Sequence, residues 1–198
     1  MRYNILVNQA VPFYRALANV EGVKQTFMEE FAIDLVWTGG HQVLPALDQL
    51  AGCLRMVYPD NYCNESCGHC TTGSDCQQSH HRSTERFIRI SPGNRQIAHF
   101  RFVNFRLCTY ITPPFPHFPI HIGDRVNGAA FRLRYDLIVS THLGNELKTT
   151  AHEIAHLFGA RDWVCTPNQE CIMHPDFDVH NRWCDRCRSD ILNYRNRS

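Results

Sequence analysis

The sequence predicts an α/β (α+β) domain built on a mixed, mostly parallel sheet. Residues 3–7 and 32–37 are apolar, strand-like runs on either side of a segment with helical periodicity. Such a β-α-β unit favours parallel pairing of the two strands with a right-handed crossover. Residues 136–140 form another apolar, β-branched run, directly before a second segment with helical periodicity. A run of this kind is typical of a buried strand.

The first helix is predicted to begin near Pro12, because proline suits the first turn of a helix. Apolar residues at intervals of three and four form one face, which we expect to cover the sheet. They are Phe13, Leu17, Val20, Val23, Phe27 and Phe31. Gly39-Gly40 is predicted to end the following strand, residues 32–37.

Further strands are predicted at residues 86–90 and 97–111. The second contains Phe100, Phe102 and Phe105, which we expect to pack in the core and not to bind a ligand. The proline-rich residues 113–119 cannot donate a regular ladder of hydrogen bonds, so they are predicted to form a loop.

Residues 151–162, AHEIAHLFGARD, carry the clearest functional pattern. His152 and His156 are four apart, so on a helix both rings can reach one metal ion. Glu153 can reach a water on that ion, as a general base must. Gly159 can adopt the left-handed conformation that ends a helix, and Asp162 then returns as a third ligand. Three protein ligands plus water is the arrangement of a catalytic zinc site.

The residues around this motif predict a helix packed on the core. Apolar residues recur at helical spacing on the side away from the histidines. They are Leu147, Ala151, Ile154 and Phe158. Asn145 is suited to cap the start of the helix. A surface helix with chance histidines is the alternative for the five-residue motif alone, and this context disfavours it.

Length and composition predict one domain, covering residues 1–198. A chain of 198 residues with 43% hydrophobic residues can bury an adequate core. Its formal net charge of +1 indicates no nucleic-acid partner. No apolar stretch approaches the roughly 20 residues that span a bilayer, so no membrane partner is expected either. The N-terminal apolar patch is too short for a secretory signal, and we therefore expect a cytoplasmic protein. We expect it to be a monomer.

Four of the ten cysteines predict a second, structural zinc site. Cys165 and Cys171, with the pair Cys184 and Cys187, provide the four thiolates of a closed tetrahedral site. In a reducing cytosol, thiols at short spacing bind metal more often than they form disulfides. The alternative is two disulfides in a secreted protein.

A second cysteine cluster lies in a predicted insertion at about residues 53–82. Cys63, Cys67, Cys70 and Cys76 would be held by a further metal or by disulfides. Possible additional ligands are His69, His80 and His81. The spacing C-x3-C-x2-C also matches the iron-sulfur loop of radical enzymes that use S-adenosylmethionine, but the chain lacks their repeated strand-helix units. Cys53 and Cys108 have no assignable partner and are expected to be buried thiols.

The zinc motif, followed by Cys171-Ile172-Met173, resembles that of the metzincin zinc peptidases, and most closely the archaemetzincins. In that family four cysteines after the motif bind a second zinc, as the chain's four would. Met173 matches the methionine of the turn beneath the metal. The chain departs from the family by having Asp162 where archaemetzincins have histidine, which is similar to snapalysin-like metzincins. It also has a shorter gap between Met173 and Cys184.

The resemblance also implies details of the fold. We expect a metzincin-like zincin domain with an active-site helix and a C-terminal subdomain at about residues 160–198 that carries the methionine turn. It further implies that residues 127–131 form an antiparallel edge strand bordering the cleft, where Gly128, Ala129 and Ala130 would bind an extended peptide. The alternative is an ordinary edge strand.

The sequence therefore predicts a zinc metallopeptidase, either an endopeptidase or an aminopeptidase, acting on a peptide or protein. A metal-activated water would attack the peptide carbonyl, with Glu153 as general base. One alternative is a zinc-stabilised binding protein that retains the site without turnover. Another is a zinc amidohydrolase that does not act on peptides, because specificity depends on loops that sequence does not define.

Overall fold

The computed structural model describes residues 1–8, 10–44, 53–56, 93–103, 107–111, 125–126, 128–132, 135–141, 144–162, 165–166, 170–174 and 181–196. A five-stranded sheet has the order β2-β1-β4-β8-β7. Its strands are β1 (Arg2–Asn8), β2 (Val36–Leu44), β4 (Ala98–Val103), β7 (Gly128–Phe131) and β8 (Asp136–Ser140). The first four in that order are parallel, and β7 runs antiparallel to β8. The predicted mixed, mostly parallel sheet is confirmed.

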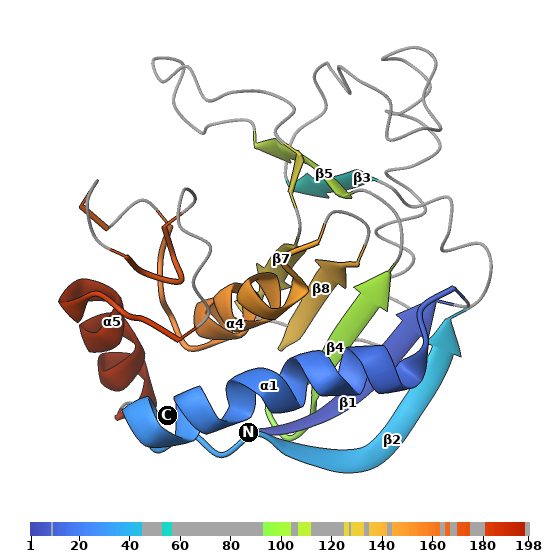
Figure 1. The fold of residues 1–198 in the computed structure, drawn as a ribbon, viewed down its shortest axis with the longest axis horizontal. Coiled ribbons are helices and arrows are strands. Elements are labelled where there is room, and N and C mark those ends of the chain that lie inside the picture. Colours follow the sequence, from blue (N-terminus) through green and yellow to red (C-terminus); the bar gives the residue numbers. More distant parts are fainter. Residues whose placement is uncertain are drawn as a thin grey trace.

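Two helices cover the same face of this sheet (Figure 1). They are α1 (Phe13–Phe31) and α4 (Glu146–Leu157), which contact each other. The predicted apolar face of α1 is confirmed, because Val20, Val23, Phe27 and Phe31 are fully buried, while Phe13 and Leu17 pack at its margin. None of the helices in the described ranges is long and apolar enough to cross a membrane.

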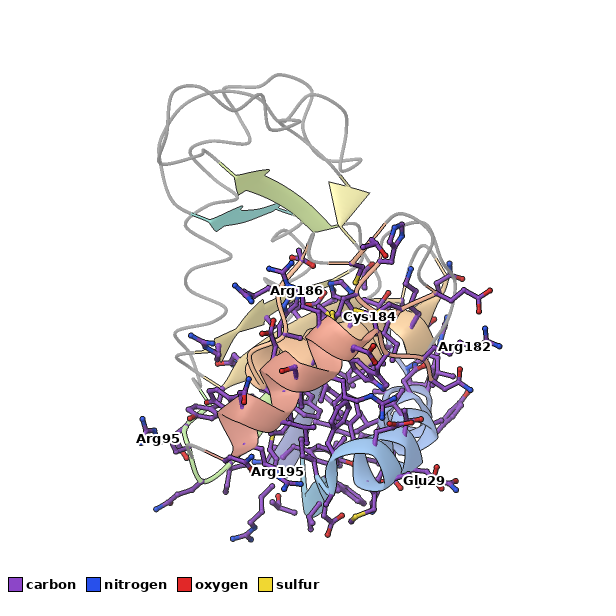
Figure 2. All side chains as sticks on the ribbon, turned by 90° about the vertical axis from the view of Figure 1, so that its left-hand side faces the viewer. Glu29, Arg95, Arg182, Cys184, Arg186 and Arg195 are labelled. Atoms are coloured by element: carbon purple, nitrogen blue, oxygen red, sulfur yellow. The ribbon has the colours of Figure 1, made fainter. Side chains whose placement is uncertain are left out.

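The C-terminal helix α5 (Asp185–Arg195) packs beside α1. Figure 2 shows Cys184 at its start and Arg195 at its end, where the Arg195 guanidinium donates a hydrogen bond to the Phe31 carbonyl. Trp183 precedes the helix and packs edge-on against Phe27 and Phe31, with ring centroids 5.4 and 5.0 Å apart. These contacts fix the C-terminal segment to α1.

The prediction that Gly39-Gly40 ends the second strand is wrong. β2 begins at Val36 and continues to Leu44. Tyr3 of β1 pairs with Trp37 and Ile5 pairs with His41, so the register shifts at the glycines. Gly39 has a φ of 85°, which glycine adopts at no steric cost. The glycines therefore form a bulge that keeps the strand in the sheet.

The single strand predicted at residues 97–111 is two strands in different sheets. β4 lies in the main sheet, whereas β5 (Leu107–Ile111) lies between β3 (Cys53–Met56) and β6 (Arg125–Val126) in a separate sheet. Cys53 and Cys108 occupy opposed positions in the parallel register of β3 and β5. A long run of strand-forming residues does not reveal where a chain changes sheets, because both halves keep strand character.

Several predictions lie outside the described residues. These are the strand at residues 86–90, the loop at 113–119 and most of the insertion at 53–82. The same holds for Cys63, Cys67, Cys70, Cys76, His69, His80 and His81.

Replacing Ala32 with glycine is expected to stabilise the protein by about 0.5–1 kcal/mol. Ala32 ends α1 in the left-handed conformation, with φ 50° and ψ 38°. Its amide and that of Ile33 donate to the carbonyls of Met28 and Phe27, at 2.9 and 3.1 Å. Glycine adopts this conformation without the Cβ penalty. Urea unfolding measures the change in the free energy of unfolding.

The matched control is Ala18→Gly, at an exposed position inside α1. The same chemical change is expected to destabilise the protein there by about 0.5–1 kcal/mol, because glycine is a poor residue in a helix interior. Equal effects of the two substitutions would contradict the strained cap at Ala32.

Candidate functional site

Helix α4 presents the histidines on one side and packs its other side on the core. Ala151 and Ile154 are fully buried, and Phe158 is nearly so. The predicted stripe is confirmed, with Leu147 packed at its margin. Asn145 occupies the position before the helix, as predicted, but its side chain makes no capping hydrogen bond. Its φ of 55° is left-handed, whereas a capping side chain requires an extended residue.

The helix ends in the predicted left-handed glycine. Gly159 has a φ of 86°, and its amide donates to the His156 carbonyl at 3.0 Å. The next amide, of Ala160, donates to the Ala155 carbonyl at 3.1 Å. This turn reverses the chain at once and returns Asp162 to the histidines.

The structure brings His152, His156 and Asp162 together. The two Nε2 atoms are 3.1 Å apart, and Oδ1 of Asp162 lies 3.1 Å from Nε2 of His152 and 3.3 Å from Nε2 of His156. Ligands about 2.0–2.1 Å from a tetrahedral zinc ion lie about 3.3–3.4 Å from one another. The donor set and its spacing therefore fit zinc.

Each histidine is oriented by a backbone carbonyl on its other ring nitrogen. Nδ1 of His152 lies 3.1 Å from the Ile172 carbonyl oxygen, and Nδ1 of His156 lies 2.8 Å from that of Ala160. A carbonyl only accepts, so both Nδ1 atoms donate and Nε2 keeps its lone pair when the ring is neutral. Metal-binding histidines in proteins are fixed in this way.

Glu153 is buried beside these ligands, with 5% of its surface exposed. Its Oε2 is buried and has no hydrogen-bond partner among the described residues. Burial raises the pKa of Glu153, although His152 and His156 oppose this effect. A buried carboxylate oxygen without a hydrogen-bond partner destabilises the folded protein unless it binds a group that is not part of the chain. The carboxyl group is therefore suited to accept a proton inside the site.

In the metal-free protein, the charges of the site favour protonated histidine. Burial would lower the pKa of His156, but the hydrogen bond to Asp162 and the charge of Glu153 outweigh it and raise the pKa to about 9. Burial would raise the pKa of Asp162, but hydrogen bonds from His152 and His156 hold it well below its usual range. In the metal-free site, a protonated imidazole beside the Asp162 carboxylate thus supplies the positive charge that a metal ion would supply among the three side chains.

We expect the His156 ring to titrate near pH 9 in the metal-free protein. Because the folded pKa exceeds the unfolded value of about 6.5, its contribution to stability is complete below pH 6.5 and lost as pH rises through 9. Imidazole NMR shifts report the titration. Asp162→Asn should lower the pKa of His156, since the charge of Asp162, which raises it, is removed; an unchanged value in that variant would contradict this account.

A buried turn, Cys171–His174, contacts the histidine site through the Ile172 carbonyl. The His174 amide donates to the Cys171 carbonyl at 2.9 Å, and the Ile172 amide donates to the Arg182 carbonyl at 2.9 Å. Met173 within it is 1% exposed. Lys148 Nζ donates to the His174 carbonyl at 3.0 Å. The turn is thus connected to α4 on one side and to the C-terminal segment on the other.

Sequence reasoning missed the contacts of Lys148 and the carbonyls of Ala160 and Ile172. Lys148 precedes His152 by one helical turn, so its position on the same face was a usable signal. The sequence carries no signal for the two carbonyl contacts, because every residue has a backbone carbonyl.

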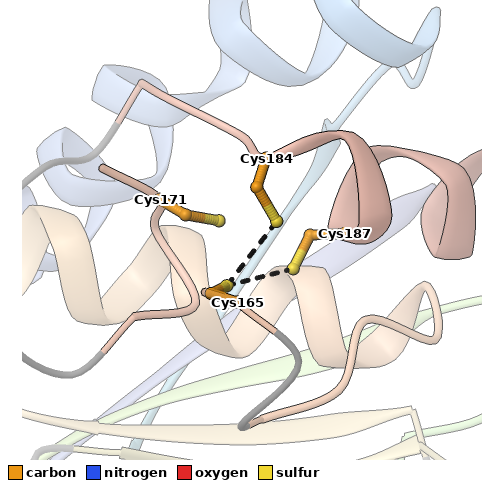
Figure 3. Close-up of side chains that lie close together, drawn as sticks. All are labelled: Cys165, Cys171, Cys184 and Cys187. Atoms are coloured by element: carbon orange, nitrogen blue, oxygen red, sulfur yellow. Dashed lines mark hydrogen bonds between the residues drawn. The ribbon is translucent and has the colours of Figure 1, made fainter. Parts of the chain in front are cut away.

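The four C-terminal cysteines form a second cluster (Figure 3). Sγ of Cys165 lies 3.6 Å from those of Cys184 and Cys187. All four sulfur atoms lie within 4.8 Å of one another, and the four cysteines are free thiols. A disulfide bond requires about 2.05 Å, whereas thiolates about 2.3 Å from a tetrahedral zinc ion lie about 3.8 Å apart. The cluster fits zinc and not two disulfides.

The thiols of this cluster cannot all ionise without a cation. A hydrogen bond from Cys187 lowers the pKa of Cys171 to about 5. That same bond raises the pKa of Cys187, and burial raises the pKa of Cys165 to about 12. One thiolate therefore forms at the expense of its neighbours. A divalent metal stabilises all four as thiolates.

Gly128, Ala129 and Ala130 lie on β7 at one end of the main sheet. They pair with Val139, Ile138 and Leu137 of β8. β7 contacts α4, and Gly128 lies directly against Glu153. The substrate-binding role of these residues remains a prediction.

No model of a known protein family matches the chain, and no curated protein matches its sequence. Among solved structures, it is similar to archaemetzincin from Methanopyrus kandleri, with a TM-score of 0.55 and 15% identity over 99% of this chain and 96% of that one. A zinc-dependent peptidase from Methanocorpusculum labreanum gives a TM-score of 0.48 and 17% identity, over 96% and 99% of the two chains. The chain therefore has an archaemetzincin-like fold, as predicted.

Proposed function

We propose that this chain is a zinc-dependent metallopeptidase whose catalytic zinc is held by His152, His156 and Asp162. The observation that carries the proposal is the set of three donor atoms, 3.1–3.3 Å apart, beside a buried carboxylate oxygen without a hydrogen-bond partner in the described structure. The archaemetzincin-like fold supports it.

The residues divide the chemistry between them. His152, His156 and Asp162 would hold the ion with three protein donors, the number that catalytic zinc sites use. The chemistry that zinc would supply there is Lewis-acid polarisation of the scissile carbonyl and activation of the attacking water. Glu153 takes the proton of the attacking water and later returns it to the leaving amine nitrogen. The β7 backbone around Gly128 is proposed to align an extended peptide.

A second zinc is proposed at Cys165, Cys171, Cys184 and Cys187. Four protein ligands close the coordination sphere, so this ion has a structural role. The cluster includes Cys171, the first residue of the turn that contains Met173 and the Ile172 carbonyl. We propose that this zinc holds the turn beneath the catalytic site.

The test is hydrolysis of a mixed peptide library by the zinc-loaded chain, read by mass spectrometry. His156→Ala should lose one zinc and all detectable cleavage, whereas His41→Ala, an exposed histidine on β2, should lose neither. Two bound zinc ions without cleavage of any peptide would instead favour the zinc-stabilised binding protein. Cleavage of non-peptide amides alone would favour an amidohydrolase.

A further inference from the structure

β7 approaches α4 so closely at Gly128 that a side chain does not fit between them. A Cβ atom at this position would lie 2.7 Å from both Cγ and Oε1 of Glu153, and 2.8 Å from Cγ2 of Thr149. Real Cβ atoms essentially never show contacts under 3.0 Å. Any other residue at position 128 therefore forces a neighbour to move.

The neighbour with freedom to move is Glu153. Thr149 is buried and β-branched, so its χ1 angle is restricted. Its hydroxyl also donates to the Asn145 carbonyl at 3.0 Å. Glu153 has three side-chain torsions, and its Oε2 has no hydrogen-bond partner in the part of the chain that is described. A Cβ at Gly128 would thus displace the Glu153 carboxylate before it displaced Thr149.

Resting on the proposed function, we infer that Gly128 is a positioning residue that sets the place of the Glu153 carboxylate beside the zinc ligands. Because Gly128 has no side chain, β7 can pack directly against the side chain that Glu153 projects from α4. A misplacement of about 1 Å at a reacting group costs about 10²-fold in rate. This role differs from main-chain binding of a peptide, which an alanine at position 128 would preserve.

The first test compares Gly128→Ala with Gly22→Ala. Both place a Cβ against α4, but at Gly22 it meets the flexible end of Leu147, 2.6 Å away. Gly128→Ala is expected to lower kcat about 10–100-fold with KM and zinc content unchanged. Gly22→Ala is expected to leave kcat as it is. Wild-type kcat in Gly128→Ala overturns the inference, and so does loss of zinc together with activity.

The second test does not depend on activity. A crystal structure of zinc-loaded Gly128→Ala should show the Glu153 carboxylate displaced, with His152 and His156 in place. Gly128→Ala should also lower the melting temperature less in a Glu153→Ala background, where its main steric conflict is removed. An unmoved Glu153, equal shifts in both backgrounds, or failure to fold in both backgrounds overturns the inference.

The two tests separate this inference from the proposed function. If the wild-type chain cleaves no peptide, the function fails, while the crystal structure and the melting temperatures still decide whether Gly128 places Glu153. If the wild-type chain cleaves peptides and Gly128→Ala does so equally well, the function stands and the inference fails.

Discussion

Glu153→Gln is expected to lower kcat for peptide hydrolysis by about 10²–10⁴-fold while the two proposed zinc ions are retained. Glutamine has nearly the same shape as glutamate, but its amide cannot take a proton from water at neutral pH. The zinc ligands are other residues, so metal content should not change. Turnover rates and elemental analysis of the same preparation measure the two quantities.

The stability of this variant should not fall with its activity. Wild-type Glu153 is buried with an unpartnered Oε2 among the described residues, and burial of that charge opposes folding. A buried neutral amide costs less than a buried charge, so the melting temperature should be unchanged or higher. Loss of activity with gain of stability is typical of a group retained for function.

The matched control is Glu146→Gln on the same helix. Glu146 forms an ion pair with Arg15 and accepts a hydrogen bond from Asn19 at 2.7 Å. Its replacement should cost a little stability and leave kcat unchanged. Retained hydrolysis in zinc-replete Glu153→Gln would reject Glu153 as the general base, whatever the control shows.

The grouping of His152, His156 and Asp162 was accessible from sequence because its determinants are local. His152 and His156 are related by one helical turn. Gly159 adopts the predicted left-handed conformation, which returns Asp162 within three residues. None of these relations depends on the rest of the fold. The same reasoning failed at Asn145, where the residue type suits a cap but its backbone conformation does not.

The contacts that refine the site were not accessible, because they join segments distant in sequence. The Ile172 carbonyl contacts His152, which is 20 residues away in the sequence. Gly128 contacts Glu153, which is 25 residues away in the sequence. Glycine has several uses, and spacing alone does not distinguish them. Gly39 marks a bulge inside β2, Gly159 ends a helix, and Gly128 makes room for a side chain.

Cys187→Ser is expected to remove the second zinc and to destabilise the protein by several kcal/mol, because structural zinc sites have apparent binding energies of about 10–16 kcal/mol in small domains. Cys187 is fully buried in the first turn of α5. Zinc stoichiometry and thermal unfolding of the reduced protein measure both effects.

The same substitution should also weaken zinc binding at the histidine site by about 10–100-fold. Cys171 of the cluster begins the turn whose Ile172 carbonyl orients His152, so loss of the cluster zinc frees that carbonyl. Ser189→Ala, on the exposed side of α5, is the control and should leave both zinc ions in place.

Disulfides would give another pattern: reductant alone would destabilise the wild-type chain, and a single zinc would survive Cys187→Ser. Because the Cys165 sulfur lies 3.6 Å from those of Cys184 and Cys187, too far for a disulfide bond, reductant should instead have no effect, and chelator should unfold the C-terminal segment.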